Sequence, residues 1–278
     1  MKPPGSAATL FQRALASLPD RGRSVELLDV SVFRGELVAG RYRLRNGLVL
    51  VLMCDPRAPV FAYHSWMRVG SKHESPARTG VAHLLEHLMF KATANNPAGF
   101  FDREMERRGA ETNAATWVDW TYYHQVLAHR GDNLSTVVDF EVDRLRNLVF
   151  EPDAFEAELE VVCNERRMSI DDSALGALGE AVYSEAFRSH PYRHPTIGLS
   201  DHLASMKLND VESFYRDFYR PEQAVVVVVG DIDVSDTLRL LVSKYEPLPS
   251  YGALLPQAKP EPVQHEVRQV EIERPVHA

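Results

Sequence analysis

The chain has 278 residues, of which 45% are hydrophobic, and a formal net charge of -8 at pH 7. This length allows one large domain or two of ordinary size, each with a buried core. The acidic balance argues against nucleic acid or an anionic membrane as the main partner, because either would favour a basic face. The two cysteines are too few for a disulfide framework or a cysteine-based zinc knuckle. A bound metal would therefore have to use histidine and carboxylate ligands.

The sequence contains no run of about 18 apolar residues, the length that a membrane-spanning helix requires. Residues 1–25 carry apolar positions at helical spacing without the apolar core of a secretory signal, so we expect an amphipathic lead-in helix. A transit peptide is the alternative, because Arg13, Arg21 and Arg23 precede most of the acidic residues, although Asp20 counts against it. We expect a soluble protein that resides in the cytoplasm rather than being exported.

Between residues 30 and 80, the sequence has the patterns of strands and turns. Gly35 and the Asn-Gly pair at 46–47 are turn signals in a pattern that alternates and then becomes continuously apolar. This pattern predicts a hairpin that enters a buried strand over 30–53. A similar strand is expected over 61–69, followed by a polar loop over 70–80.

After residue 80, most of the chain has the residue spacing of helices, and strands are expected in three places. Helices are expected over 81–90, 100–108, 132–150, 153–168, 173–187, 209–219 and 235–245. Strands are expected as a pair within 110–123, over 225–229 and over 265–273. Five consecutive valines predict that the strand over 225–229 is buried on both faces. Prolines predict a loop over 190–195 and a linker over 247–262.

Two of these helices carry explicit start signals. Asn209 and Glu212 are spaced like a capping box, and Ser235 stands where a cap is expected for the following helix.

The segment His83-Leu84-Leu85-Glu86-His87 carries the strongest chemical signal. At 100° per residue, its two histidines and its glutamate fall within about 100° of the helix surface. Imidazole suits zinc, and a catalytic zinc needs three protein ligands with an open position for water. The order His-x-x-Glu-His is the signature of the inverzincins. The alternative is an amphipathic helix whose histidines are ordinary partners of core or surface groups.

A third ligand is expected on the acid-rich helix that follows. Glu165 is the best candidate, and Glu158 lies seven residues earlier, so both carboxylates point within about 20° of each other. The alternative is a solvated acidic face that Arg166 and Arg167 balance.

With these residues the chain resembles the metallopeptidases of family M16. Their pattern is His-x-x-Glu-His followed by a glutamate ligand, with a second functional glutamate seven residues before that ligand. Further segments in family order carry the resemblance over about residues 38–248, and they are 42–47, 70–71, 109–116, 192–198 and 214–230.

The resemblance implies an α+β domain with a mostly antiparallel, mixed sheet and helices packed on it. We expect this metal-bearing domain over 26–248, after the lead-in segment 1–25. Residues 249–278 would form a proline-rich linker and the start of a second half.

The resemblance also implies a zinc-dependent endopeptidase that hydrolyses peptides or unfolded protein segments. His83, His87 and Glu165 would ligate the Zn2+, and Glu86 would be the general base. Glu158 would support the site by orienting a ligating histidine or the water.

Asn113 and Ala114 match the edge strand on which the family lays its substrate, so they would meet the peptide by β-augmentation. The alternative for Asn113 is a turn residue.

Family members pair this half with a homologous second half that lacks zinc, so we expect such a half, or a homo- or heterodimeric partner, to complete the chamber. The activity of the chain alone is therefore open. A non-catalytic partner subunit is the rival function, and the intact motif argues against it. A structural zinc module is a further rival, but such sites normally close four ligands and use cysteine.

Overall fold

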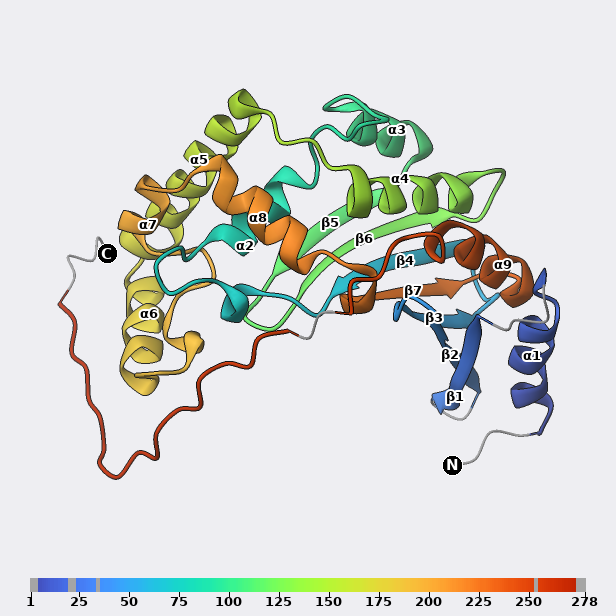
Figure 1. Ribbon diagram of the computed structural model, residues 1–278, viewed down its shortest axis with the longest axis horizontal. Helices are drawn as coiled ribbons and strands as arrows, with labels where there is room; N and C mark the ends of the chain where they lie inside the picture. The colour runs from blue at the N-terminus through green and yellow to red at the C-terminus, as the bar shows by residue number, and fades with distance from the viewer. Residues whose placement is uncertain (1–4, 20–23, 34–35, 253–254, 274–278) are drawn as a thin grey trace.

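The computed structural model describes residues 5–19, 24–33, 36–252 and 255–273 (Figure 1). Its centre is one seven-stranded sheet in the order β1-β2-β3-β7-β4-β6-β5. The strands are β1 (Val25–Phe33), β2 (Leu37–Leu44), β3 (Val49–Cys54), β4 (Val60–Met67), β5 (Glu111–Thr116), β6 (Thr121–Ala128) and β7 (Ala224–Gly230). The β3–β7 pair is parallel and the other pairs are antiparallel. The predicted mixed, mostly antiparallel sheet is therefore confirmed.

Helices pack on one face of this sheet and extend beyond its edge strand β5 (Figure 1). They are α1 (Gly5–Ala16), α2 (Val81–Leu88), α3 (Phe100–Arg108), α4 (Asn133–Asn147), α5 (Pro152–Arg166), α6 (Ala174–Ala186), α7 (Ser200–Ala204), α8 (Leu208–Phe218) and α9 (Val234–Tyr245). A π-helical turn, Arg167–Asp171, continues α5. None of the described helices is both long and apolar enough to cross a membrane.

Side chains along each strand point alternately to the helix-covered face of the sheet, where they are buried, and to the opposite face. Along β6, Tyr123, Gln125 and Leu127 are almost fully buried, whereas their neighbours are half-buried. Val226 and Val228 of β7 are buried, whereas Val225, Val227 and Val229 are half-buried, so the prediction that this strand is buried on both faces is wrong. The strand is central, since β7 pairs with β3 on one side and with β4 on the other, but the described helices pack on one face of the sheet.

The N-terminal strands form a three-stranded meander, where the sequence predicted a hairpin over 30–53. The predicted turn at the Asn46-Gly47 pair is present, and Gly47 has a φ of 89° that favours glycine. The Asn46 amide donates to the carbonyl oxygens of Tyr245 (2.8 Å) and Leu248 (3.2 Å). The other turn signal, Gly35, lies outside the described residues. The lead-in helix is present as α1, and Phe11 on it is buried in the core.

Both predicted helix caps are wrong. The carboxylate of Asp233, not Ser235, caps α9 by accepting from the backbone N–H of Asp236 (2.8 Å). The earlier start brings Val234 into the core. Helix α8 begins at Leu208, and Asp210 rather than Glu212 reaches back to the backbone N–H of Lys207 (3.0 Å).

The predicted strand over 265–273 is also wrong, because residues 255–273 form an extended segment without secondary structure. Glu261 fixes this segment to the end of α6 by accepting from the backbone N–H groups of Arg188 (2.8 Å), Ser189 (2.8 Å) and His190 (2.9 Å). Arg268 donates to the carbonyl oxygens of Glu185 and Ala186. Val267 and Val270 remain exposed, since no described strand pairs with the segment. The predicted domain boundaries at 25 and 248 stay predictions.

A buried ion pair ties α4 to the sheet. Arg144 and Glu141 lie one turn apart and pair with each other, and both side chains are only 2% exposed. Glu141 also accepts from the Gln125 amide of β6 (2.9 Å), and the Arg144 guanidinium lies 4.3 Å from the centre of the Phe101 ring. A charge in such a place is tolerated only while its partner is present.

The substitution Arg144→Met should lower the free energy of unfolding by about 3–5 kcal/mol, because it leaves the Glu141 charge buried without its partner. The double substitution Arg144→Met with Glu141→Leu should recover much of this loss. Urea unfolding of the single and double variants measures both values. An equal loss in the two variants would contradict the assignment of the cost to the unpaired charge.

Candidate metal centre

Helix α2 presents one apolar and one polar face. Val81, Leu84, Leu85 and Leu88 are at most 3% exposed and form the apolar face in the core. His83, Glu86 and His87 are half-buried on the opposite side of the helix. The spacing of the apolar residues therefore places the three polar side chains together on the other side of the helix, as predicted. The helix ends at Leu88, two residues earlier than predicted.

Helix α5 brings Glu165 to the two histidines. The Glu165 Oε2 atom lies 3.8 Å from His83 Nε2 and 3.6 Å from His87 Nε2. Ligands that share one tetrahedral zinc, with bonds of roughly 2.0–2.2 Å, lie roughly 3.3–3.6 Å apart. Among the described residues, these three form the one group of at least three His, Cys, Asp or Glu side chains whose ligand atoms gather, within 4.8 Å of one another. Their spacing fits a shared metal ion.

The protonation of His83 also fits a ligand. Burial, and then the nearby His87, lower the pKa of His83 to about 4. The imidazole is therefore neutral at pH 7 and offers a lone pair without first losing a proton.

Glu158 contacts His87 from the side opposite Glu165. Its Oε2 atom lies 3.1 Å from His87 Nδ1, and its Oε1 atom lies 2.5 Å from the ammonium of Lys91. Burial opposes ionisation of Glu158, but the hydrogen bonds from Lys91 and His87 outweigh it and lower the pKa. An ionised Glu158 accepts a hydrogen bond from Nδ1–H of His87 and leaves Nε2 as the nitrogen with the free lone pair.

Glu158 and Arg166 of the acid-rich helix are not part of a solvated charged face. The Glu158 side chain is 13% exposed and that of Arg166 is 8% exposed. Arg166 pairs with Glu180 of α6 (2.9 Å) and donates to the Gly198 carbonyl (2.5 Å). The alternative interpretation is wrong for these two residues, because Arg166 joins α5 to its neighbours instead of balancing surface acids.

Glu86 lies between α2 and the edge strand β5. Its Oε2 atom accepts a hydrogen bond from the Thr116 hydroxyl at 2.5 Å. Burial raises the pKa of Glu86, and the hydrogen bond from Thr116 acts in the opposite direction. A carboxylate in this environment is a stronger base than one in water.

The residues predicted to bind substrate lie on an exposed edge of the sheet. Strand β5 pairs with β6 alone, with Asn113 opposite His124 and Ala114 opposite Tyr123. Because faces alternate along a strand, Ala114 and Thr116 share the side of Glu86, and Asn113 points to the other side. The backbone N–H of Ala114 donates to Asn113 Oδ1 (2.8 Å). The alternative of a turn residue is wrong for Asn113, which lies within the strand.

Three residues near the site escaped the sequence analysis, and they are Glu74, Lys91 and Thr116. Lys91 lies three residues beyond the end of α2, so helical spacing carried no signal for its contact with Glu158. Thr116 and Glu74 act through tertiary contacts for which the sequence carries no local signal.

Glu74 caps the N-terminus of α2 from the preceding loop. Its two carboxylate oxygens accept from the backbone N–H groups of Gly80 (3.0 Å) and Ala82 (2.8 Å). These donors have no partner within the helix. Burial raises the pKa of Glu74 from 4.5 to about 8, and the two hydrogen bonds oppose this rise.

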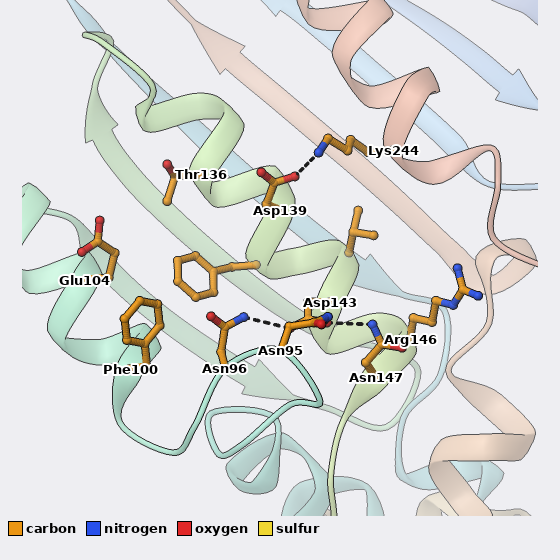
Figure 2. Close-up of a pocket in the computed structure, with 12 residues that line it drawn as sticks. Asn95, Asn96, Phe100, Glu104, Thr136, Asp139, Asp143, Arg146, Asn147 and Lys244 are labelled. Atoms are coloured by element: carbon orange, nitrogen blue, oxygen red, sulfur yellow. Dashed lines mark hydrogen bonds and ion pairs between the residues drawn. The ribbon is translucent and has the colours of Figure 1, made fainter.

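A larger cavity, of about 530 Å3, lies away from this centre beside α3 and α4 (Figure 2). Its polar side chains largely bind one another. Asp143 accepts from Asn96 (2.9 Å) and Asn147 (2.7 Å), and Lys244 pairs with Asp139 (2.6 Å). These contacts with Asp143 hold loop 93–97 against α4.

Comparison with known proteins relates the chain to one family. Residues 50–199, more than half of the chain, match the family described as insulinase, peptidase family M16. Residues 205–277 match the peptidase M16 inactive domain. The zinc protease PqqE of Helicobacter pylori is 34% identical over 206 residues, which cover 74% of this chain and 46% of that protein.

Solved structures share the fold. The crystal structure of a protease from Helicobacter pylori matches with a TM-score of 0.77 and 32% identity, covering 81% of this chain and 54% of that chain. The first half of the periplasmic protease PqqL from Escherichia coli matches with a TM-score of 0.71 and 25% identity, covering 83% and 50%. The chain spans about half the length of the curated relatives that it matches.

The raised pKa of Glu74 predicts a pH-dependent stability. Between pH 4.5 and about 8 the folded protein holds a proton on Glu74 that the unfolded chain releases, so stability should fall as pH rises through this window. Each unit of pKa difference corresponds to about 1.4 kcal/mol. Relative to Glu74→Gln, which cannot titrate, the wild type should lose several kcal/mol in urea unfolding between pH 5 and 9. Parallel pH profiles for the two proteins would contradict this.

Proposed function

The chain belongs to the insulinase family of peptidases, family M16, and we propose that it is the metal-bearing half of a zinc-dependent endopeptidase. The observation that carries the proposal is the convergence of His83, His87 and Glu165 beside a buried carboxylate, Glu86. Three ligands leave one coordination position open, which is the arrangement of a catalytic rather than a structural site.

His83, His87 and Glu165 would hold the zinc ion. When bound, the ion would lower the pKa of a water molecule toward 7 and stabilise negative charge on the carbonyl oxygen of the substrate. Glu158 accepts a hydrogen bond from Nδ1–H of His87 (3.1 Å) and would thereby keep the imidazole oriented toward Glu165. Lys91 pairs with Glu158, so Lys91 fixes Glu158 and Glu158 fixes His87.

Glu86 would act as general base and then as general acid. Its carboxylate takes a proton from the attacking water and passes it to the leaving amine. Thr116 binds one carboxylate oxygen at 2.5 Å, and this contact fixes the orientation of the carboxylate between helix and strand. Burial raises the proton affinity of Glu86, which suits both roles.

The substrate would add a strand to β5. This edge has free backbone groups, and the N–H of Ala114 is covered only by the side chain of Asn113 (2.8 Å). A peptide backbone that displaces the Asn113 amide would pair with the edge by β-augmentation. Such pairing requires an extended segment, which favours peptides and unfolded protein segments as substrates.

A second half of the same family would complete the enzyme, either in the same protein or as a partner chain. The length of the relatives supports this proposal, because the chain matches about half of each. A non-catalytic partner subunit is the alternative function, and it would retain the fold without needing Glu86.

The variant Glu86→Gln should bind close to one zinc per chain, as the wild type does, because Glu86 is not among the ligands. It should cleave a quenched unfolded peptide at least ~100-fold more slowly, since general-base catalysis contributes roughly that much or more. Metal analysis and cleavage are measured with and without the second family half. Full turnover by Glu86→Gln would overturn the mechanism, and a wild type free of zinc after chelator-free purification would overturn the site.

Replacing Glu158 should weaken zinc binding without removing a ligand. We expect Glu158→Gln to lose about 10–100-fold in affinity, because His87 loses the group that orients it. Competition with a chromophoric chelator measures the affinity. Glu160→Gln, an exposed position on the same helix, is the matched control and should bind like the wild type. Equal affinities for all three proteins would show that Glu158 does not support the site.

A further inference from the structure

A cavity of about 410 Å3 is formed by three segments that are far apart in the sequence. They are the loop before α2 (71–79), the loop after α6 (188–194) and the extended segment at 256–259. Its volume is in the range of small-ligand sites. His194 borders both this cavity and a smaller one, of about 370 Å3, whose wall includes His83 and Glu165. The 410 Å3 cavity is therefore a neighbour of the candidate metal centre and contains none of its ligands.

Cations dominate the wall of this cavity. Its charged side chains are four cations, Lys72, Arg188, Arg193 and Lys259, and one acid, Glu74. Both carboxyl oxygens of Glu74 are engaged by backbone N–H groups at the start of α2, and the residue is only 8% exposed. Burial raises the pKa of Glu74 to about 8, so this group is mostly neutral at pH 7. In a chain with a net charge of -8, the wall is a local reversal of the overall charge.

Two of the four cations lack a carboxylate partner. Lys72 and Arg188 each pair with a carboxylate, at 2.6 Å and 3.5 Å. Among the described residues, Arg193 donates only to the carbonyl oxygen of Arg188 (3.1 Å), and Lys259 has no ion pair. Burial lowers the pKa of both histidines in the wall, so neither adds much charge at pH 7. The surplus positive charge therefore comes from Arg193 and Lys259.

The loop after α6 already binds one carboxylate. Glu261 of the extended segment accepts from the successive backbone N–H groups of residues 188–190. Successive N–H groups of this kind form an anion-binding concavity. Because Glu261 fills it, a further anion would be left with the side chains of the wall. The same contact holds Lys259, two residues before Glu261, beside the cavity.

We infer that this cavity binds a carboxylate of the peptide, at a position removed from the bond that is cleaved. The inference rests on the proposed function and names its substrate class, which is peptides with an acidic group at that position. Arg193 and Lys259 would pair with the carboxylate, and such charge-assisted hydrogen bonds are stronger than neutral ones. The Ser189 hydroxyl and the Gln257 amide, which also line the cavity, would supply uncharged donors.

Backbone hydrogen bonds connect the cavity to the strand that would hold the peptide. Strand β5 ends at Thr116, and the carbonyl oxygens of the next two residues accept from the N–H groups of Ser71 (3.1 Å) and Lys72 (2.9 Å). Ser71 and Lys72 belong to the wall of the cavity. A peptide that continues past the end of β5 would therefore reach this wall.

The test compares acidic peptides with their neutral counterparts. A labelled unfolded peptide carries Glu or Gln in turn at each position, and its C-terminus is a free acid or an amide, so side-chain and terminal carboxylates are distinguished. Binding is measured by anisotropy with the Glu86→Gln protein. At one position, or at the C-terminus, the acidic form should bind at least ~10-fold more tightly than the neutral form, because it gains charge-assisted hydrogen bonds.

Two variants assign this preference to the cavity. Arg193→Gln and Lys259→Gln should each lower the preference at least ~3-fold, and together they should abolish it. Lys259 lies in a segment without secondary structure, so its variant is decisive even if Arg193→Gln folds poorly. Arg239→Gln removes a positive charge from an exposed position of α9 outside the cavity. This matched control should keep the full preference.

Failure of the carboxylate site and failure of the proposed function give different results. Cleavage of quenched peptides by the wild type without any preference for an acidic group would overturn the site and leave the proposed function intact. A preference that survives in both variants would also overturn the site. A preference that both variants lose, in a protein that cleaves no peptide with or without the second half, would overturn the proposed function and support the site. If no peptide is bound or cleaved, both proposals fall.

Discussion

The burial of one face of α2 is the constraint on which the candidate site depends. Four apolar side chains of this helix are in the core, so His83, Glu86 and His87 must face away from it, toward α5 and β5. Packing in the core fixes the rotation of α2 about its axis. Glu74 fixes the N-terminus of this helix by accepting hydrogen bonds from two backbone N–H groups. A ligand set assembled from two helices needs this rigidity, because small shifts would separate the imidazoles from Glu165.

Charge around the site is arranged as a series of pairs that extend outward from the histidines. His87 contacts Glu158, Glu158 contacts Lys91, and two turns further along α5 Arg166 contacts Glu180. Each buried charge thus has a partner of opposite sign, which is the condition under which burial is tolerated. Glu86 and Glu74 are exceptions, since the described hydrogen bond of Glu86 comes from a neutral hydroxyl and those of Glu74 come from backbone N–H groups. Burial raises the pKa of both carboxyl groups.

Much of the local structure could be predicted from periodicity, and the tertiary contacts could not. The 3.6-residue spacing placed His83, Glu86 and His87 on one side of α2, and the seven-residue spacing placed Glu158 and Glu165 on one side of α5. No spacing shows that α5 meets α2, so Glu165 as a third ligand needed the family resemblance. The pairing of β3 with β7, far apart in sequence, was equally hidden. The strand expected over 265–273 failed because alternation favours a strand only where a partner edge is present.

The hydrogen bond between Thr116 and Glu86 connects two parts of the proposed site, the helix with the metal ligands and the strand that would bind the peptide. Glu86 belongs to the helix that carries the metal ligands, and Thr116 ends the strand that would hold the peptide. Reaction rates depend steeply on the distance and orientation of the reacting groups. Because one contact of 2.5 Å relates Glu86 to this strand, a peptide bound along β5 would be held at a fixed position relative to the proposed general base.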